Sequence, residues 1–272
     1  MKVLTPILAA GALFTFQTVG SAALVAWYPL DGDANDASGN GYNGSTIGTG
    51  VTHAQAGANA ATGQSTDFSG AGHIDVPWNA ALNSQDFTVT LWANADAAGG
   101  SFRSPISNRD DVAPGGVNRH GWIVYNDNAG NWSFWNGGGL NTAGGWNVAN
   151  AGAVTTNAWN HIAISYDSVT NTKEFYLNGA LVSTTNPIGF SPNDSSLADG
   201  LTHEDEDMHI GGGGDAGTSF RWDGRLDDVT IWNTALSGAE IDNIRLNSVP
   251  EPAALVLIGG AGVGLILRRR RR

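Results

Sequence analysis

Residues 222–237 read Trp-Asp-Gly-Arg-Leu-Asp-Asp-Val-Thr-Ile-Trp-Asn-Thr-Ala-Leu-Ser. The segment Leu226–Trp232 within this stretch has the β-branched and aromatic composition that predicts a strand. Asp227, Val229 and Ile231 occupy alternate positions, so they share one face of this strand. We expect that face to point toward the core, where the carboxylate of Asp227 needs a partner.

The same stretch ends at a helix start signal. Ser237 can cap a helix over Ser237–Leu246, because Glu240 stands at the capping-box position. Ile241, Ile244 and Leu246 supply an apolar side for this helix. It is the one helical candidate between residues 24 and 248.

Short strand-like segments recur through the rest of the chain, separated by turns rich in Gly, Asn and Asp. Apart from Leu226–Trp232, they are Leu24–Leu30, Thr66–Phe68, His73–Val76, Phe87–Ala93, Gly121–Asn126, Asn131–Asn136, Trp159–Tyr166, Glu174–Leu177, Leu181–Thr184 and Met208–Ile210. Hairpins are predicted at residues 69–72, at 127–130 and at Asn178-Gly179, the strongest turn signal of the three. The polar stretch 187–201 is predicted to be a long loop. Many short strands, one helix and no linker predict a single all-β sandwich over residues 24–248.

The charge of this middle part limits its partners. Residues 24–248 hold 7 basic and 24 acidic residues, a net charge of −17. Such a surface repels phosphate backbones, so nucleic acid is excluded as a partner, whereas divalent cations are favoured. The chain contains no cysteine, so disulfides cannot stabilise the domain.

The first 23 residues have the pattern of a secretory signal peptide. Lys2 precedes the apolar stretch Ile7–Phe16, and the small residues Gly20-Ser-Ala-Ala23 follow. We expect cleavage after Ala22 or Ala23.

The last 24 residues carry a three-part pattern. Pro250, Glu251 and Pro252 precede an uncharged apolar run, 253–267, and five arginines, 268–272, end the chain. An apolar run followed by arginines is typical of a membrane segment whose tail stays in the cytoplasm. This run spans only about 22 Å, against ~30 Å of hydrocarbon, and snorkelling arginines with local bilayer thinning could cover the difference.

This tail resembles the PEP-CTERM sorting signal of Gram-negative bacteria. The resemblance implies export, anchoring in the inner membrane, and processing near Pro250–Pro252 by an exosortase-type protease. It also implies a final place at the cell surface or in an extracellular matrix rich in exopolysaccharide. The alternative is an ordinary C-terminal transmembrane helix over 249–272 that is never cut.

A second resemblance covers nearly all of 24–248. It rests on loose motifs that occur in a fixed order, namely residues 25–44, 87–92, 159–167, 175–179, 209–213 and 222–241. Together they resemble the laminin-G-like jelly roll of the concanavalin A-like lectin/glucanase superfamily. The resemblance implies two curved antiparallel sheets of about six or seven strands each, with the first and last strands side by side.

Many members of this family hold a structural calcium ion, and the local chemistry permits one here. The candidate ligands are hard oxygen donors in a glycine-rich loop, with one more from the last strand: Asp31, Asp33, Asp36, Asn40, Asn43 and Asp227. An ion joining them would attach the first loop to the last strand. The alternative is a solvated turn stabilised by Asx side chains, with Asp227 accepting backbone hydrogen bonds.

The acidic stretch His203–His209 invites catalytic interpretations, and two of them fail. A zinc-protease helix needs His-Glu-x-x-His, but these histidines are six positions apart in a β-rich context. Glucanases of this kind carry a Glu-x-Asp-x-x-Glu strand, whereas the carboxylates of residues 204–206 are consecutive. Consecutive residues of a strand face opposite sides, so these carboxylates would not share one face. A charged loop or an additional cation site remains, and no catalytic residue is assigned.

Tryptophans and basic side chains between residues 103 and 146 are the candidates for ligand binding. The set is Trp122, Trp132, Trp135, Trp146, Arg119 and His120. Tryptophan faces can stack on sugars, while arginine and histidine can bind hydroxyl groups. Trp132 and Trp135 are an odd number of positions apart and must face opposite sides of their strand, so only part of the set can reach a common face.

The sequence therefore predicts an exported, non-catalytic protein that recognises polysaccharide or a cell-surface glycan, with calcium as a structural ion. An adhesive or structural matrix protein that binds protein partners is the first alternative. A glycan-processing enzyme is the second.

Overall fold

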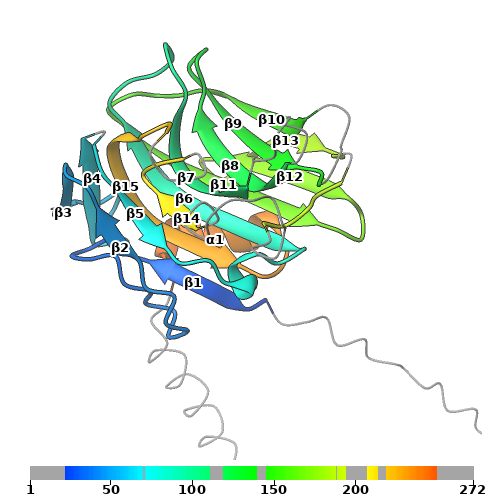
Figure 1. Ribbon diagram of the computed structural model, residues 1–272, viewed down its shortest axis with the longest axis horizontal. Coiled ribbons are helices and arrows are strands. Elements are labelled where there is room, and N and C mark those ends of the chain that lie inside the picture. Colours follow the sequence, from blue (N-terminus) through cyan, green and yellow to red (C-terminus); the bar gives the residue numbers. More distant parts are fainter. Residues whose placement is uncertain are drawn as a thin grey trace, which may run out of the picture.

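The computed structural model describes residues 22–69, 71–110, 119–139, 145–187, 189–193, 207–213 and 219–249. Two antiparallel sheets lie face to face in this part of the chain (Figure 1). The back sheet has eight strands, in the order β13-β12-β11-β6-β15-β4-β3, with β1 also paired to β15. The front sheet has seven, in the order β10-β9-β8-β7-β14-β5-β2. The predicted all-β sandwich is confirmed.

The back sheet consists of β1 (Leu24–Tyr28), β3 (Val51–Ala56), β4 (Gln64–Ser69), β6 (Phe87–Ala95), β11 (Trp159–Asp167), β12 (Thr172–Leu177), β13 (Ala180–Thr185) and β15 (Asp223–Trp232). The front sheet consists of β2 (Ser45–Ile47), β5 (His73–Val76), β7 (Arg103–Asp110), β8 (His120–Asn126), β9 (Asn131–Gly137), β10 (Trp146–Ala153) and β14 (Met208–Ile210). A short 3-10 helix, η1 (Ala80–Leu82), and one α-helix, α1 (Gly238–Asn247), complete the described elements.

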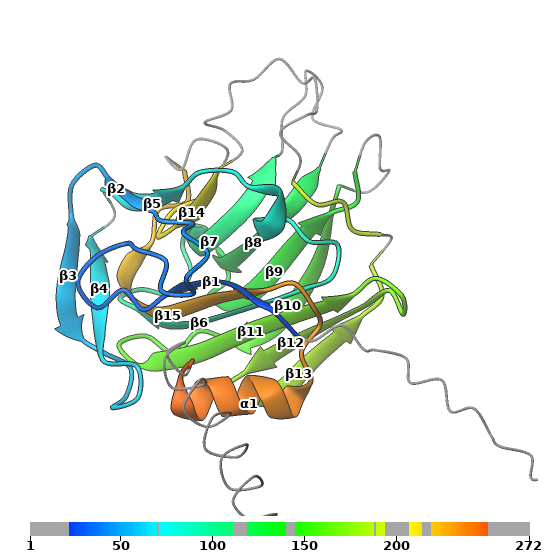
Figure 2. The same ribbon diagram turned by 90° about the horizontal axis from the view of Figure 1, so that it is seen from below.

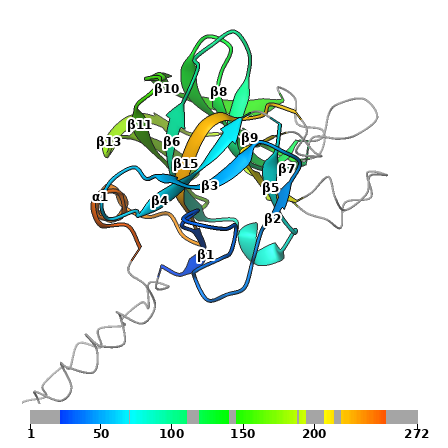
Figure 3. The same ribbon diagram turned by 90° about the vertical axis from the view of Figure 1, so that its left-hand side faces the viewer.

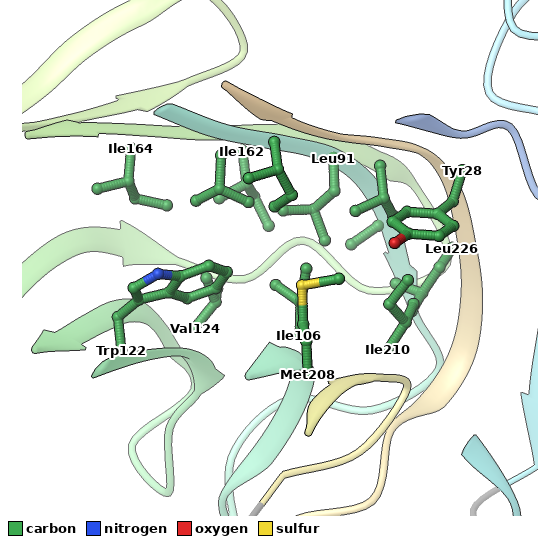
Figure 4. Close-up of a cluster of buried hydrophobic side chains, with 14 of the residues drawn as sticks. Tyr28, Leu91, Ile106, Trp122, Val124, Ile162, Ile164, Met208, Ile210 and Leu226 are labelled. Atoms are coloured by element: carbon green, nitrogen blue, oxygen red, sulfur yellow. The ribbon is translucent and has the colours of Figure 1, made fainter. Parts of the chain in front are cut away.

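The core fills the space between the inner faces of the two sheets. Leu91, Ile162 and Ile164 point from the back sheet toward Trp122 and Val124 of the front sheet (Figure 4). All five side chains are buried. Strict alternation places them there, since every second residue of a strand faces the same side.

The first and last strands lie side by side, as expected. Residues 26–28 of β1 pair with residues 229–231 of β15 in antiparallel register. The two described ends of the chain are also close together, because Ala22 and Val249 line the same cavity beside α1.

Helix α1 covers the outer face of the back sheet (Figure 2). Ser237 is its N-cap and forms the predicted capping box with Glu240. Ile241 and Ile244 are buried against Ala163 and other residues of that face. Leu246 is 54% exposed, so its predicted place on the apolar side is wrong.

Two of the three predicted hairpins form. The turn at 127–130 joins β8 to β9, and Asn178-Gly179 joins β12 to β13. The turn at 69–72 instead connects the two sheets, since β4 pairs with β3 and β15 while β5 pairs with β2 and β14 (Figure 3). The alternation of apolar residues is the same in both arrangements, so it could not distinguish a hairpin from a crossover.

The predicted signal peptide, 1–23, and the predicted sorting segment, 249–272, lie outside the described residues except for residues 22, 23 and 249. No helix in the described part of the chain combines the length and hydrophobicity that a membrane crossing requires. The described part of the predicted loop 187–201 contains no strand or helix.

The stacked pair Trp132 and Trp222 allows a test of the core. Trp132 is fully buried, and the two ring centroids are 5.9 Å apart. We predict that Trp132→Ala lowers the free energy of unfolding by about 3–5 kcal/mol, because it leaves a large cavity. Val169→Ala is the control, since Val169 is 91% exposed. Urea unfolding followed by circular dichroism measures both, and equal midpoints would contradict the core assignment.

The dependence of folding stability on pH tests whether the ring of His161 is buried. Its ring is buried, and it packs edge-on against Trp92 at 5.1 Å between centroids. Burial, with a smaller contribution from Arg245 of α1 and against the opposing effect of Asp242, lowers the pKa of His161 from 6.5 to about 3. Below pH 6.5 the unfolded chain therefore binds a proton that the folded chain does not, so stability falls as pH falls.

We predict that this effect removes about 2 kcal/mol of stability between pH 7 and pH 5, given ~1.4 kcal/mol per pH unit. Replacement His161→Phe should remove that part of the pH dependence. Urea unfolding of both proteins at the two pH values measures the difference between them. An identical loss of stability in the two proteins would refute the assignment.

Candidate functional site

Aromatic side chains gather on the outer face of the front sheet. Tyr125 and Trp135 point away from the core, because their strand neighbours Val124 and Phe134 point into it. The Tyr125 ring lies 5.3 Å from those of both Trp135 and Phe220, in edge-to-face contact. Phe102 adds a further edge-to-face contact with Trp135 at 5.6 Å. Such pairs stabilise each other beyond the area they bury.

Two arginines extend this group to Trp146 at the start of β10. The guanidinium of Arg109 lies 5.4 Å from the ring centroid of Trp146 and 5.7 Å from that of Phe220. The guanidinium of Arg119 lies 5.8 Å from the Trp146 centroid. These are cation–π distances. We call the set the aromatic–arginine cluster: Phe102, Arg109, Arg119, Tyr125, Trp135, Trp146 and Phe220.

The cluster is only partly covered. Phe102, Arg119, Trp135, Trp146 and Phe220 keep part of their surface exposed, whereas Tyr125 and Arg109 are buried. The result is a fixed aromatic surface with guanidinium groups beside it. It can present flat apolar faces and hydrogen-bond donors to a ligand at the same time.

Of the six residues predicted to bind a ligand, Trp135, Trp146 and Arg119 come together in this cluster. Trp122 and Trp132 do not, because their side chains face the core and are 3% and 0% exposed. Trp122 stacks on Phe87 at 5.9 Å between centroids. A ligand on the outer face therefore cannot reach either ring.

His120 also lies apart from the cluster. Its Nδ1 is 2.8 Å from Oγ of Ser191, and its side chain lines a separate cavity of about 310 Å³ together with Trp78 and Asn193. The sixth predicted residue is thus placed on the opposite side of the front sheet from the cluster.

Sequence reasoning did not assign Phe102 or Phe220 to the site, and it included Arg109 only among the basic side chains near the tryptophans in sequence. Arg109 belongs to β7, whose polar sequence Arg-Ser-Pro-Ile-Ser-Asn-Arg-Asp gives no strand signal. Phe102 and Phe220 stand just before β7 and β15, outside any periodic pattern. No sequence signal links them to Trp146, since only the pairing of the strands brings them together.

The oxygen donors predicted in the first loop are mostly bonded within that loop. Asp36 accepts hydrogen bonds from the backbone N–H groups of Trp27, Ser38 and Tyr42 at 2.8–3.0 Å. Oδ1 of Asn43 accepts the N–H of Asp36 at 3.0 Å. These contacts are those of an Asx-stabilised turn.

The side chains of Asp33 and Asn40 also form hydrogen bonds within the loop or to the adjacent strand. Asp33 accepts hydrogen bonds from the backbone and side chain of Asn35 at 2.9 and 2.6 Å. The side-chain amide of Asn40 donates to the carbonyl groups of Leu24 and Val25 at 3.1 and 2.8 Å. These side chains hold the loop against β1.

Asp31 and Asp227 lie on either side of the turn 57–63. Oδ2 of Asp227 accepts hydrogen bonds from the N–H of Ala58 and from Oγ1 of Thr62, both at 2.7 Å, while its buried Oδ1 has no hydrogen-bond partner. Oδ1 of Asp31 accepts the N–H of Gln64 at 2.5 Å. A side chain at Gly63 would lie within 2.7 Å of Asp31, so only glycine permits this approach.

Asp227 is buried, but not in the way that strand alternation predicts. A bulge follows it at Asp228, where φ is 51°. Because the bulge shifts the alternation, Leu226 joins Val229 in the core instead of Asp227. Asp227 is covered by the turn 57–63, and burial raises its pKa to about 7.

Asp228 is the acidic neighbour that the sequence analysis did not assign. Its Oδ1 accepts the indole N–H of Trp27 at 2.5 Å, and burial raises its pKa. A cavity of about 570 Å³ lies beside this group and is lined by Trp27, Asp31, Thr62, Ser248 and further residues of the loop and the chain end.

Solved structures share the fold at low sequence identity. Domain 4 of an extracellular arabinanase from Geobacillus stearothermophilus, in complex with arabinotriose, is 18% identical, with a TM-score of 0.56 over 82% of this chain and 98% of that one. The CBM40 of a Ruminococcus gnavus sialidase, bound to α2,3-sialyllactose, is 17% identical, with a TM-score of 0.51 over 66% of this chain and 95% of that one. The binding domain of Paraclostridial Mosquitocidal Protein 1 is 18% identical, with a TM-score of 0.59 over 82% of this chain and 51% of that one.

Sequence comparison identifies both parts of the chain. No curated protein matches it significantly. A family model of the PEP-CTERM protein-sorting motif matches residues 248–272, which implies export and sorting to the cell surface. A second family model matches residues 68–242, most of the described sandwich. The chain therefore belongs to the concanavalin A-like lectin/glucanases superfamily.

Proposed function

We propose that this protein is an exported, non-catalytic binding protein that recognises polysaccharide or a cell-surface glycan. The observation that carries the proposal is the aromatic–arginine cluster on the outer face of the front sheet. Trp135 and Trp146 expose part of their rings there, beside the guanidinium groups of Arg109 and Arg119.

The chemistry of the cluster suits a sugar. Pyranose and furanose rings have apolar C–H faces that can pack on an indole, while their hydroxyl or carboxylate groups can accept hydrogen bonds from guanidinium. Binding surfaces often combine a large aromatic anchor with arginine, the residue types that contribute most when buried by a partner. The mutual packing of the rings keeps this surface in place before a ligand arrives, which lowers the entropic cost of binding.

The comparisons support a binding role. Two of the similar structures were solved with an oligosaccharide bound, arabinotriose in one and sialyllactose in the other. The sorting motif adds an exosortase-type protease and the inner membrane as proposed partners before the protein reaches the cell surface or matrix.

An adhesive matrix protein that binds protein partners is the second candidate. The similarity to the binding domain of a mosquitocidal toxin favours it, because a related sandwich serves there as a binding domain. The net charge of −17 over residues 24–248 excludes neither candidate, since a neutral glycan and a basic protein both tolerate it. A glycan-processing enzyme is a third candidate, for which no catalytic residue is proposed.

We also propose a structural calcium ion between the first loop and β15. Asp227 and Asp31 would hold it, because Oδ1 of Asp227 is buried without a hydrogen-bond partner and Asp31 approaches the same turn. Calcium also accepts carbonyl and water oxygens, so the remaining positions need no further carboxylate. Asp33, Asp36, Asn40 and Asn43 would support the loop around the ion, since their side chains are already bonded within it.

The glycan proposal predicts that Trp146→Ala lowers the affinity for a bound glycan at least tenfold, or about 1.4 kcal/mol. Trp159→Ala is the matched control. Trp159 lies in the back sheet, with the guanidinium of Arg225 5.3 Å from its ring centroid, so it has the same type of contact on the other side of the molecule.

Isothermal titration of the full chain in mild detergent against a panel of bacterial exopolysaccharides and host glycans would measure these affinities. Wild type should bind saturably, and Trp159→Ala should bind like wild type. Equal weakening in both variants would place the site elsewhere. Absence of binding to every glycan would favour the adhesive candidate.

The calcium proposal predicts that a hundredfold excess of Ca²⁺ over its Kd raises the melting temperature by about 5–10 °C. Asp227→Asn should abolish the increase, because it removes the charge and retains the shape of the side chain. Asp96→Asn is the control, since Asp96 is exposed and lies just after β6, outside the first loop. Scanning calorimetry with calcium and then with chelator would measure the melting temperature of each protein. A wild-type melting temperature that is the same in both conditions would rule the ion out.

A further inference from the structure

His73, Asp75 and His209 converge on the outer face of the front sheet. His73 and Asp75 are two positions apart on β5, so they share a face. Strand β14 lies beside β5 (Figures 1 and 2), and its residue His209 pairs with Asp75. Their inner neighbours Ile74 and Ile210 face the core. The three side chains come from distant parts of the chain and meet only because β5 pairs with β14.

The distances between their polar atoms are short. Nε2 of His73 lies 2.8 Å from Oδ1 of Asp75, and Nε2 of His209 lies 3.3 Å from the same oxygen. One ligand atom from each of the three residues fits within 4.8 Å of the other two. Ligand atoms about 2.0–2.2 Å from a tetrahedral metal ion are separated by about 3.4 Å, so this spacing is close to that of a metal site.

The contacts lack the geometry of hydrogen bonds. Oδ1 of Asp75 has no hydrogen-bond partner, although two imidazole nitrogens lie within 3.3 Å of it. Nδ1 of His73 is also buried without a partner. Buried polar atoms normally form hydrogen bonds, so a group of them that crowds together without bonding needs another explanation. Ligand atoms aimed at a common point between them give that arrangement.

Burial favours the form of histidine that binds metal. His73 and His209 are 3% and 2% exposed. A neutral imidazole keeps a free lone pair on one ring nitrogen, and this is the atom that binds a metal ion. The side chain of Asp75 is 29% exposed, which leaves a path for an ion and a place for water.

We propose that His73, Asp75 and His209 form a binding site for a divalent transition-metal ion, most naturally Zn²⁺, with solvent completing the coordination. Two imidazoles and one carboxylate are the donors that Zn²⁺ takes at tetrahedral sites with an open position. Calcium prefers an all-oxygen set, so this site is chemically distinct from the calcium site proposed at Asp31 and Asp227.

The guanidinium of Arg109 does not occupy the site. Arg109 lies on β7, next to β14, and its positive charge acts on His209. Its guanidinium is directed to the rings of Trp146 and Phe220 in the aromatic–arginine cluster. The charge of Asp75 offsets this repulsion toward a bound cation.

Zinc binding by the full chain tests the proposal. The protein, purified in mild detergent without a histidine tag and stripped with chelator, would be titrated with Zn²⁺ by calorimetry, and bound metal would be counted by elemental analysis. We expect about one zinc ion per chain. Asp75→Asn and His209→Gln should each weaken binding more than ~100-fold, because losing a ligand exceeds the 10–100-fold cost of losing an outer-shell partner.

His53→Gln is the matched control. His53 lies on β3 of the back sheet and contacts Oγ1 of Thr66 at 2.7 Å and Oγ1 of Thr46 at 3.4 Å. Thr46 pairs with Ile74 and so shares its side of the front sheet, which is opposite to the side of the three proposed ligands. It should bind Zn²⁺ like wild type. Cobalt substitution adds a second readout, because Co²⁺ in a tetrahedral nitrogen and oxygen site gives intense visible absorption that the Asp75→Asn protein should lack.

Two results would overturn the proposal. One is that wild type binds neither Zn²⁺ nor Co²⁺. The other is that the Asp75→Asn and His53→Gln proteins bind with equal affinity. Circular dichroism of the metal-free variants shows whether each folds, and Asp75→Asn keeps the test valid if His209→Gln does not, since Asp75 is partly exposed.

Discussion

The hydrogen bonds that β15 makes with three other strands hold the back sheet together. It pairs with β6 along most of its length, with β4 at its beginning and with β1 at its end. The bulge at Asp228 lies between these last two pairings and bonds to the indole of Trp27. The beginning and the end of the domain are thereby joined, and the acidic group around Asp227 depends on the same bulge.

The parts of the fold that follow from local rules could be predicted from the sequence. Alternation placed Phe87, Val89 and Leu91 in the core, and Asn178-Gly179 and the capping box at Ser237 are signals with a local mechanism. Long-range choices could not be predicted. The turn at 69–72 suits a hairpin or a crossover, and one extra residue at Asp228 reverses the side that Asp227 faces.

The candidate site could be predicted from the sequence to a similar extent. The odd spacing of Trp132 and Trp135 required one of them to be buried, but parity alone cannot say which. Phe102, Phe220 and His73 carry no signal of their own, since strand pairing between distant segments creates their surroundings. Residues that act through local geometry can be recognised in the sequence, whereas residues that meet across a sheet require the topology.

The sandwich also separates the two described ends of the chain from the proposed binding face. Ala22 and Val249 lie beside α1, which covers the outer face of the back sheet. The aromatic–arginine cluster and the group around Asp75 occupy the outer face of the front sheet. Both faces of the back sheet are thus used for packing, one against the core and one against α1. In the described part of the chain no helix covers the outer face of the front sheet, and this is the face on which the aromatic, cationic and proposed metal-binding side chains accumulate.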